Sequence, residues 1–344
     1  MTDEPEIQEI DKYAIINKLG AGHFGAVYLA QDRALDCRKA IKVLNIKDPK
    51  SFLNELEEAQ ILNKLKHKHI VAINEANIFD VNSTPKVVID MELIEGGSLE
   101  DKLLGEHVTA IESVGYCINI LFALEHSHGQ NILHRDIKPA NIMLNGNTAK
   151  LSDFGLATSV AGTYAGSPKG YITHLAPETF SKGETTKLTD IFSVGITLYR
   201  TLCNITNWRE RIGSLPNLDN EIRKGSLIKV MGYPTYVPSK LKRVVSKACS
   251  PDPTKRYQSA REMRQALEKL ELVISWKKTS DLDWVGDCIK TGSKFDINVK
   301  QKRSGAEFVI KKNNRKIGQQ CKTFQSLEEA SQYASLWVSN NALA

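Results

Sequence analysis

Two aspartates and an asparagine lie close together in one stretch of the chain, Ile132–Gly155: they are Asp136, Asn141 and Asp153. A carboxylate can accept the proton of an attacking hydroxyl, while carboxylate and amide oxygens are ligands for Mg²⁺. Phosphoryl transfer to a hydroxyl needs both functions, because the metal must neutralise the charge of the nucleotide phosphates. The types and order of these three residues therefore predict phosphoryl transfer.

The same stretch carries two motifs, HRDIKPAN starting at His134 and DFG starting at Asp153. Together they closely resemble the catalytic loop and the metal-binding loop of the protein kinase family. The resemblance implies that Asp136 is the catalytic base, that Lys138 offsets charge at the γ-phosphate, and that Asn141 and Asp153 hold Mg²⁺. It also implies ATP as the donor and, from Lys138, serine and threonine hydroxyls of proteins as acceptors.

Near the N-terminus, Gly20, Gly22 and Gly25 form a G-x-G-x-x-G pattern. Dinucleotide-binding folds share this pattern, but there it opens a helix, whereas Ala26–Leu29 continues as a predicted strand. Backbone N–H groups in a turn between two strands can approach phosphate oxygens, as in kinases. On that resemblance, Val27 lies over the adenine ring.

The next predicted strand contains Ala40 and Lys42, and it resembles the kinase strand that carries the phosphate-binding lysine. Strand alternation puts both residues on one face, so Lys42 would reach the α- and β-phosphates. Apolar spacing over Ser51–Leu65 predicts an amphipathic helix. The family register selects Glu58 on this helix as the partner of Lys42, with Glu55 one turn away as the alternative.

A further predicted strand, Val87–Glu92, resembles the hinge between the two kinase lobes, where adenine bonds to backbone groups. By register, Met91 is the bulky residue beside the adenine. Glu92 and Ile94 would supply a backbone carbonyl and a backbone amide. The resemblance assigns Met143 to the same nucleotide site.

The segment that follows Asp153 resembles the kinase activation segment and ends in Ala-Pro-Glu at Glu178. The resemblance implies a buried ion pair of Glu178 with Arg256, and it implies that Asp190 holds the catalytic loop through backbone amides. Tyr171 stands where the family usually has threonine. Autophosphorylation of this segment is expected, and its candidate acceptors are Thr158, Ser159, Thr163 and Ser167.

Length and composition exclude several classes of protein. A chain of 344 residues suggests two or three folding units, and its net charge of +6 alone indicates no partner. Six cysteines without a close pair argue against zinc ribbons, iron–sulfur sites and disulfide frameworks, and they fit a reducing compartment. No apolar run reaches the ~18–20 residues of a membrane span, and the acidic N-terminus is unlike a signal peptide. We therefore expect a cytoplasmic protein without membrane contact.

The kinase resemblance covers residues 10–275 and implies an α+β fold with a β-rich N-lobe (10–94) and a helical C-lobe (95–275). Residues 276–290 are predicted to be a linker. Residues 291–344 are predicted to form a small β-β-β-α accessory domain, with strands at Phe295–Val299, Ala306–Ile310 and Gln319–Phe324. Ser326 and Glu329 form a capping box that starts its helix.

Between residues 288 and 322 there are ten lysines and arginines against two acids. Such basic strands resemble small nucleic-acid-binding modules, including the arm domains of phage integrases, but a protein-docking or autoregulatory surface explains the same charges. No aromatic residue is placed on them for base stacking, which favours docking. A pseudokinase scaffold or a nucleic-acid-binding protein is the alternative to an active kinase, although no catalytic position is missing.

Overall fold

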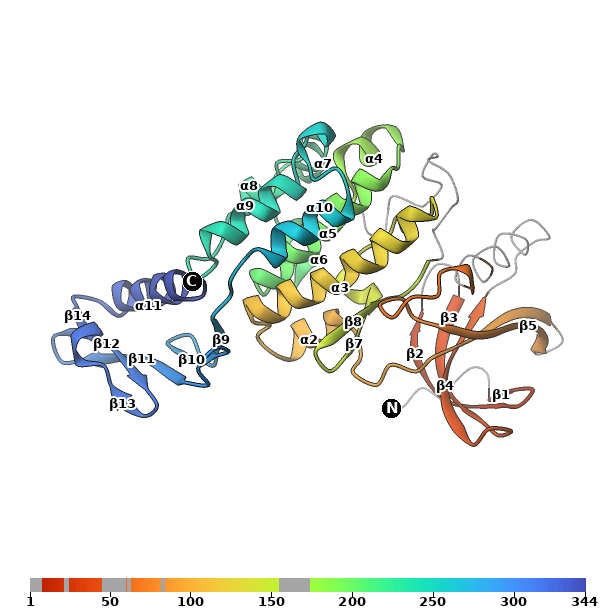
Figure 1. Cartoon of the computed structure of the whole chain (residues 1–344), viewed down its shortest axis with the longest axis horizontal. Helices are drawn as coiled ribbons and strands as arrows, with labels where there is room; N and C mark the ends of the chain where they lie inside the picture. Colours follow the sequence, from red (N-terminus) through yellow and green to blue (C-terminus); the bar gives the residue numbers. More distant parts are fainter. Residues whose placement is uncertain (1–7, 22–24, 45–59, 61–62, 82–83, 155–173) are drawn as a thin grey trace.

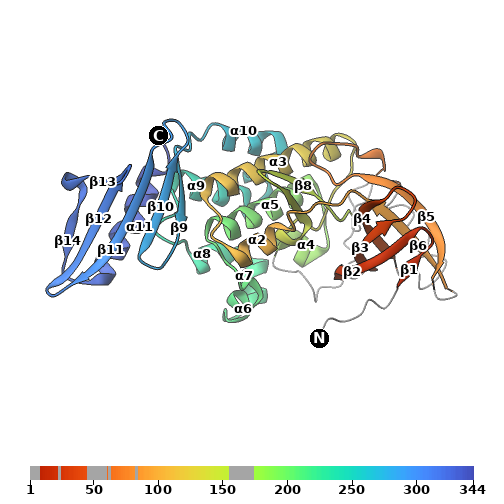
Figure 2. The same cartoon turned by 90° about the horizontal axis from the view of Figure 1, so that it is seen from below.

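The structure is a computed structural model that describes residues 8–21, 25–44, 60, 63–81, 84–154 and 174–344. Two β-sheets lie at opposite ends of the molecule, with a helical region between them (Figures 1 and 2). Within these ranges no helix has the length and apolar character needed to cross a membrane. Several predicted features lie outside the described residues: Gly22, Glu55, Glu58, Tyr171 and the candidate acceptors Thr158, Ser159, Thr163 and Ser167.

The N-terminal sheet is antiparallel, with strand order β1-β2-β3-β4-β6-β5. Tyr13, Tyr28, Ile41 and Val88 are buried on one of its faces, as strand alternation of β-branched and aromatic residues dictates. Its strands are β1 (Glu9–Ile10), β2 (Tyr13–Ala21), β3 (Gly25–Asp32), β4 (Cys37–Leu44), β5 (Ile73–Val81) and β6 (Thr84–Met91).

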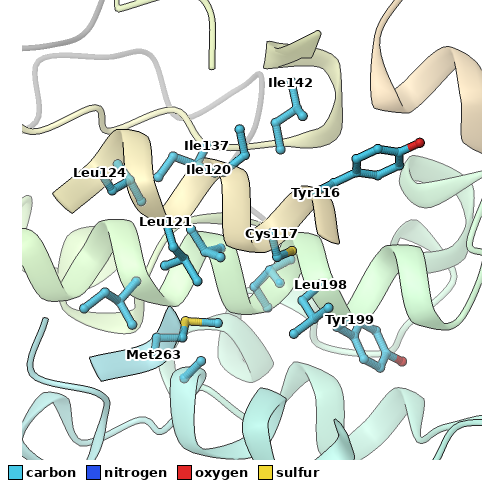
Figure 3. Packing of buried hydrophobic residues seen from close by; sticks show 14 of the residues in the cluster. Tyr116, Cys117, Ile120, Leu121, Leu124, Ile137, Ile142, Leu198, Tyr199 and Met263 are labelled. Atoms are coloured by element: carbon cyan, nitrogen blue, oxygen red, sulfur yellow. The ribbon is translucent and has the colours of Figure 1, made fainter. Parts of the chain in front are cut away.

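The helical region is built around α3 (Ala110–Gly129), which starts at a capping box formed by Thr109 and Glu112. Its apolar side chains pack against α5, α10 and strand β8 in the largest buried cluster of the described chain (Figure 3). The other helices are α2 (Leu99–Gly105), α4 (Pro177–Lys182), α5 (Lys187–Leu202), α6 (Trp208–Gly213), α7 (Leu218–Arg223), α8 (Leu227–Met231), α9 (Ser239–Ala248) and α10 (Ala260–Glu268).

A two-stranded sheet of β7 (Ile142–Asn145) and β8 (Thr148–Leu151) follows the catalytic loop, after a single 3₁₀ turn, η1 (Pro139–Asn141). Ile142 and Leu144 are buried in the cluster around α3. Met143 lies between them and therefore projects from the opposite face of the strand.

The C-terminal unit, defined here as β9–β14 and α11, is a second antiparallel sheet with order β13-β12-β11-β10-β9, in which β14 also pairs with β12. Helix α11 covers one face, so the predicted α+β class is confirmed. Its elements are β9 (Ile274–Lys278), β10 (Asp283–Cys288), β11 (Lys294–Lys302), β12 (Gly305–Lys312), β13 (Arg315–Lys316), a 3₁₀ turn η4 (Gly318–Gln320), β14 (Lys322–Phe324) and α11 (Leu327–Asn341).

This sheet corrects the sequence prediction in two respects. Residues 276–290 form most of β9 and all of β10 instead of a linker, and the sheet has six strands instead of three. Trp276 and Trp284 are buried, and they alternate with lysines and aspartates on the other face. In such short strands only a few apolar residues alternate with charged ones, so the strand pattern is hard to recognise in the sequence. Gly286 pairs with Trp276, and a Cβ at this glycine would overlap the indole ring.

The C-terminal unit packs directly against the corner between α2 and α3. The ring of Trp284 lies 5.5 Å from the ring of His107 and 5.1 Å from that of Tyr236. Ser275 Oγ is hydrogen-bonded to Oγ1 of Thr109, the N-cap of α3, at 3.2 Å, and Lys277 forms an ion pair with Glu106. The unit is therefore fixed to the same helix that leads into the catalytic loop.

Candidate active site

The catalytic loop holds its aspartate with two neighbouring side chains. Lys138 Nζ donates to Asp136 Oδ2 at 2.6 Å, and Asn141 Nδ2 donates to Asp136 Oδ2 at 3.0 Å and to the Asp136 carbonyl at 2.8 Å. Burial raises the pKa of Asp136 despite the nearby Lys138 cation. The structure thus brings Asp136, Lys138 and Asn141 together, and two hydrogen bonds hold the Oδ2 atom of Asp136 in place.

Asp190, at the start of α5, supports this loop from beneath. Its carboxylate accepts hydrogen bonds from the backbone amides of His134 at 3.0 Å and Arg135 at 2.8 Å, which confirms the predicted contact. His128 Nε2 lies 2.8 Å from the same carboxylate. Burial alone would raise the pKa of Asp190, but these hydrogen bonds hold it below its ordinary value.

The loop backbone is strained where it carries the chemistry. Arg135 has φ of 70° and Asp153 has φ of 60°, a region that non-glycine residues rarely adopt. Strain of this kind persists only where surrounding contacts over-determine the conformation. Here His134 supplies such contacts, since its Nε2 lies 2.9 Å from the Ser152 carbonyl and its ring meets the buried Phe154 ring at 4.5 Å.

Lys42 and Asp153 meet across the cleft although 111 residues separate them, with Lys42 Nζ 2.9 Å from Asp153 Oδ1. Burial acts to raise the pKa of Asp153, but the attraction of Lys42 outweighs it and lowers that pKa. The Asp153 carboxylate is therefore ionised at neutral pH. Glu58, the predicted partner of Lys42, lies outside the described residues.

Asn141 and Asp153 have the chemistry that a magnesium ion needs. The Asn141 NH₂ group is committed to Asp136, so its Oδ1 is the atom left to bind a cation. In the part of the chain that the structure describes, no three His, Cys, Asp or Glu side chains form a complete metal cage. Asn141 Oδ1 and the Asp153 carboxylate together fit Mg²⁺, which takes one or two protein ligands and completes its shell with phosphates and water.

The register of the N-terminal sheet places the predicted nucleotide residues on a common face. Val27 pairs directly with Lys42, and Ala40 pairs with Met91, so the two members of each pair point the same way. Gly20 has open space where a Cβ would be, whereas a Cβ on Gly25 would collide with the Val43 carbonyl of β4. Close packing of β3 on β4 is therefore one reason why position 25 requires glycine.

The hinge residue Glu92 has a second role that sequence reasoning missed. Its carboxylate accepts two bonds from Lys150 Nζ, at 2.7 and 2.6 Å, and one from the Ala72 amide at 2.7 Å. This clamp joins the hinge to β8. Among the described residues, no hydrogen bond engages the Glu92 carbonyl or the Ile94 amide, the two groups predicted to meet adenine.

The predicted ion pair of Glu178 with Arg256 is confirmed. Arg256 is fully buried, and its guanidinium forms a two-bond fork with the Glu178 carboxylate at 2.6 and 2.8 Å. Its remaining N–H groups reach the carbonyls of Ser250 and Leu188. The pair fixes the start of α4, so its role is structural.

Comparison with known proteins agrees with this geometry. A family model described as protein kinase domain matches residues 13–269. The serine/threonine-protein kinase PrkC of Bacillus subtilis is 32% identical over 73% of this chain and 39% of its own length. PknB of Mycobacterium leprae is 31% identical over 78% and 44%, and PknB of Mycolicibacterium smegmatis is 33% identical over 75% and 42%.

The chain spans less than half the length of these relatives. The matched family region ends at residue 269, before β9 begins at Ile274. That region nevertheless includes both lobes and every catalytic motif described above. The chain therefore belongs to the protein kinase family.

Proposed function

We propose that this protein transfers the γ-phosphoryl group of ATP to serine and threonine hydroxyls of other proteins. The observation that supports this most directly is the convergence of Lys42, Asp136, Asn141 and Asp153 from three separate segments. A pseudokinase scaffold would not need to retain all four.

Asp136 is the residue that receives the proton of the acceptor hydroxyl. Lys138 and Asn141 anchor its Oδ2, which leaves Oδ1 to orient the hydroxyl. The raised pKa of Asp136, caused by burial, makes its carboxylate a better proton acceptor. Lys138 also places a cation beside the position of the transferred phosphoryl group.

Asn141 Oδ1 and the Asp153 carboxylate would hold Mg²⁺, which supplies charge neutralisation at the nucleotide phosphates. Lys42 would release part of its contact with Asp153 and bind the α- and β-phosphates. Val27, Ala40 and Met143 would contact the adenine faces, and Met91 would be the bulky residue beside the adenine. The Glu92 carbonyl and Ile94 amide would receive the adenine edge.

The acceptor class is supported by Lys138 and by the relatives, which are named serine/threonine kinases. The sequence also supports autophosphorylation of the activation segment, where a new phosphate would pair with Arg135 beside the base. All six cysteines are unpaired, which supports a reducing compartment such as the cytoplasm.

An assay with labelled ATP, Mg²⁺ and a generic protein acceptor tests this function. Asp136→Asn should abolish incorporation, whereas Asp219→Asn on the exposed surface of α7 should not change it. Phosphoamino-acid analysis should find phosphoserine and phosphothreonine, and mostly phosphotyrosine would overturn the acceptor class. An active enzyme that carries no phosphate by intact-mass spectrometry would refute autophosphorylation.

A further inference from the structure

The positive charge of the chain is concentrated in the C-terminal unit. Residues 274–344 contain twelve lysines and arginines against seven acids, whereas the remaining residues contain 34 against 33. The unit therefore accounts for most of the net charge of +6. Salt screens such charges from one another only beyond a Debye length, about 8 Å under physiological conditions.

Part of this charge is held in an arrangement that opposes folding. In the hairpin of β12 and β13, Lys311 lies directly opposite Lys316, and Lys312 lies directly opposite Arg315. Like charges in directly opposite positions destabilise a β-sheet. A two-residue strand that contains only cations has no packing gain of its own to offset this repulsion.

The turn of this hairpin is tight, so the backbones that carry the opposing cations are held close together. Asn313 and Asn314 have φ of 48° and 64°, the left-handed conformation of a tight two-residue hairpin turn. The Asn313 amide donates to the Lys294 carbonyl at 2.8 Å, and the Lys294 amide donates to Asn313 Oδ1 at 2.9 Å. These two bonds hold the backbone of Lys294 next to the turn, so Lys294 lies beside the other cations.

We call Lys294, Lys311, Lys312, Arg315 and Lys316 the basic hairpin. Lys316 pairs with Glu307 at 3.0 Å, but within the described ranges the other four have no ion pair. Asp287 is the cross-strand neighbour of Lys294 and Asp296 is that of Lys311, and neither acid forms an ion pair with its neighbour. Consecutive strand residues point to opposite faces, so Lys294, Lys311 and Lys316 share a face with these acids and Glu307, whereas Lys312 and Arg315 have no acid opposite them. A cation pair without an opposing acid is the pattern expected of a site that binds an external anion.

We propose that the basic hairpin binds an acidic segment of a protein substrate and recruits it for phosphorylation; this rests on the proposed kinase function. The sheet face opposite α11 carries Asp283, Asp287, Asp296 and Glu307, which would repel a long polyanion laid across it. No aromatic residue is among the exposed large apolar side chains of the described residues, so bases have no stacking surface. A short acidic peptide needs only the hairpin.

The attachment of the C-terminal unit makes this site useful to the kinase. Trp284, His107 and Tyr236 fix the unit to the α2–α3 corner, so the hairpin keeps a constant position relative to Asp136. The unit lies at the end of the molecule opposite the N-terminal sheet (Figure 1). A segment docked there leaves the cleft open, so docking segment and acceptor hydroxyl must be separate parts of the substrate.

Fluorescence anisotropy with the full chain and a labelled Asp/Glu-rich peptide tests the binding step. Lys312→Gln/Arg315→Gln should weaken binding about tenfold or more, because two charge-assisted contacts are lost. Lys300→Gln/Arg303→Gln removes the same charge at the other end of β11 and β12, and it should change affinity far less.

Equal losses in the two double variants would show attraction to net charge only, and they would overturn the proposal. It would equally fail if the wild-type chain did not bind the peptide, or if a DNA duplex bound more tightly with the same dependence on Lys312 and Arg315. The peptide with Gln and Asn in place of Glu and Asp should not bind.

Steady-state kinetics test recruitment. An acceptor peptide extended by the acidic segment should have a lower KM than the unextended acceptor at unchanged kcat, and Lys312→Gln/Arg315→Gln should remove that advantage only. The same KM for both acceptors with wild-type enzyme would refute recruitment while leaving the kinase function intact. Peptide binding without any phosphorylation would instead refute the proposed function.

Discussion

The cleft and the C-terminal sheet both depend on lysines and carboxylates, but they treat charge in opposite ways. In the cleft, Lys42 and Lys138 are buried, and each contacts a carboxylate within 3 Å: Asp153 at 2.9 Å and Asp136 at 2.6 Å. In the sheet, Lys312 and Arg315 are exposed and face each other. A buried charge without a partner costs several kcal/mol, whereas water and salt stabilise an exposed one.

The difference indicates where the chain tolerates change. In the cleft and beneath it, the buried charges of Lys42, Lys138, Asp190 and Arg256 are each held by a partner group, so one substitution leaves that partner without its contact. On the exposed surface of the sheet, water replaces a lost partner. Substitutions of the same chemical type in the two regions should therefore have very different effects.

The largest contrast is expected between two aspartates. Asp153→Ala should lower the rate of phosphoryl transfer by several orders of magnitude, because it removes a metal ligand that acts in the transition state, and Lys42→Ala and Asp136→Ala should have comparable effects. Asp283→Ala, which removes a carboxylate hydrogen-bonded to Asn298 and Ser280 in the C-terminal unit, should leave turnover unchanged. Near-normal turnover in Asp153→Ala would contradict the assignment.

Loss of a buried ion pair should reduce the free energy of unfolding much more than loss of an exposed one. Arg256→Met leaves the Glu178 carboxylate without its fork and should reduce the free energy of unfolding by about 3–5 kcal/mol. Lys316→Met breaks an exposed pair with Glu307 and should cause no measurable change. Urea denaturation of the two variants measures both values, and equal losses would remove the distinction.

The contact between the two regions can be weakened at its centre. Trp284→Ala removes the indole that packs on His107 and Tyr236, and it should cost about 3 kcal/mol of stability. Hydrogen exchange should then be faster at the start of α3 and in β9. Leu336→Ala, on the exposed side of α11, is the control and should leave exchange there unchanged.

A smaller effect should depend on pH. Burial against the C-terminal unit lowers the pKa of His107 to about 4, and neither ring nitrogen has a hydrogen-bond partner among the described residues. Below its ordinary pKa of about 6.5, the unfolded chain gains a proton that the folded chain excludes, so stability falls from that pH downward.

At pH 5 this loss should reach roughly 1–2 kcal/mol. His107→Phe keeps an aromatic ring on Trp284 without a titratable group, so its stability should fall less than that of the wild type between pH 7 and pH 5. Chemical denaturation at the two pH values measures the difference. An identical change in the free energy of unfolding between pH 7 and pH 5 for the two proteins would show that His107 does not contribute to the pH dependence.

Much of the catalytic site could be predicted because its residues lie in short motifs with fixed spacing. HRDIKPAN and DFG identified Asp136, Asn141 and Asp153, and the structure brings them together as expected. The contact of Asp190 with the catalytic loop and the Glu178–Arg256 pair were also predicted, since both come from the same family pattern. The clamp of Glu92 by Lys150 was not, because 58 residues separate them and neither lies in a motif.

The C-terminal unit shows where pattern reading fails. Strands β11 and β12 were predicted, because apolar residues alternate over several positions, as was the helix start at Ser326. Glu329 completes that cap by binding the Gln325 amide. Strands β9 and β10 were assigned to a linker, and the acids that β10 adds to the sheet face were therefore left out of the charge balance.

The sequence by itself determined the family, the candidate catalytic residues and the order of the lobes, because these depend on residue type and local spacing. Only the tertiary structure decided which charges are neutralised. Pairing depends on distances across strands and helices that are remote in the chain, as between Lys42 and Asp153 or between Lys316 and Glu307. A lysine is therefore held by a carboxylate where it is buried, as Lys42 is, or remains without an ion pair where it is exposed beside another cation, as Lys312 does.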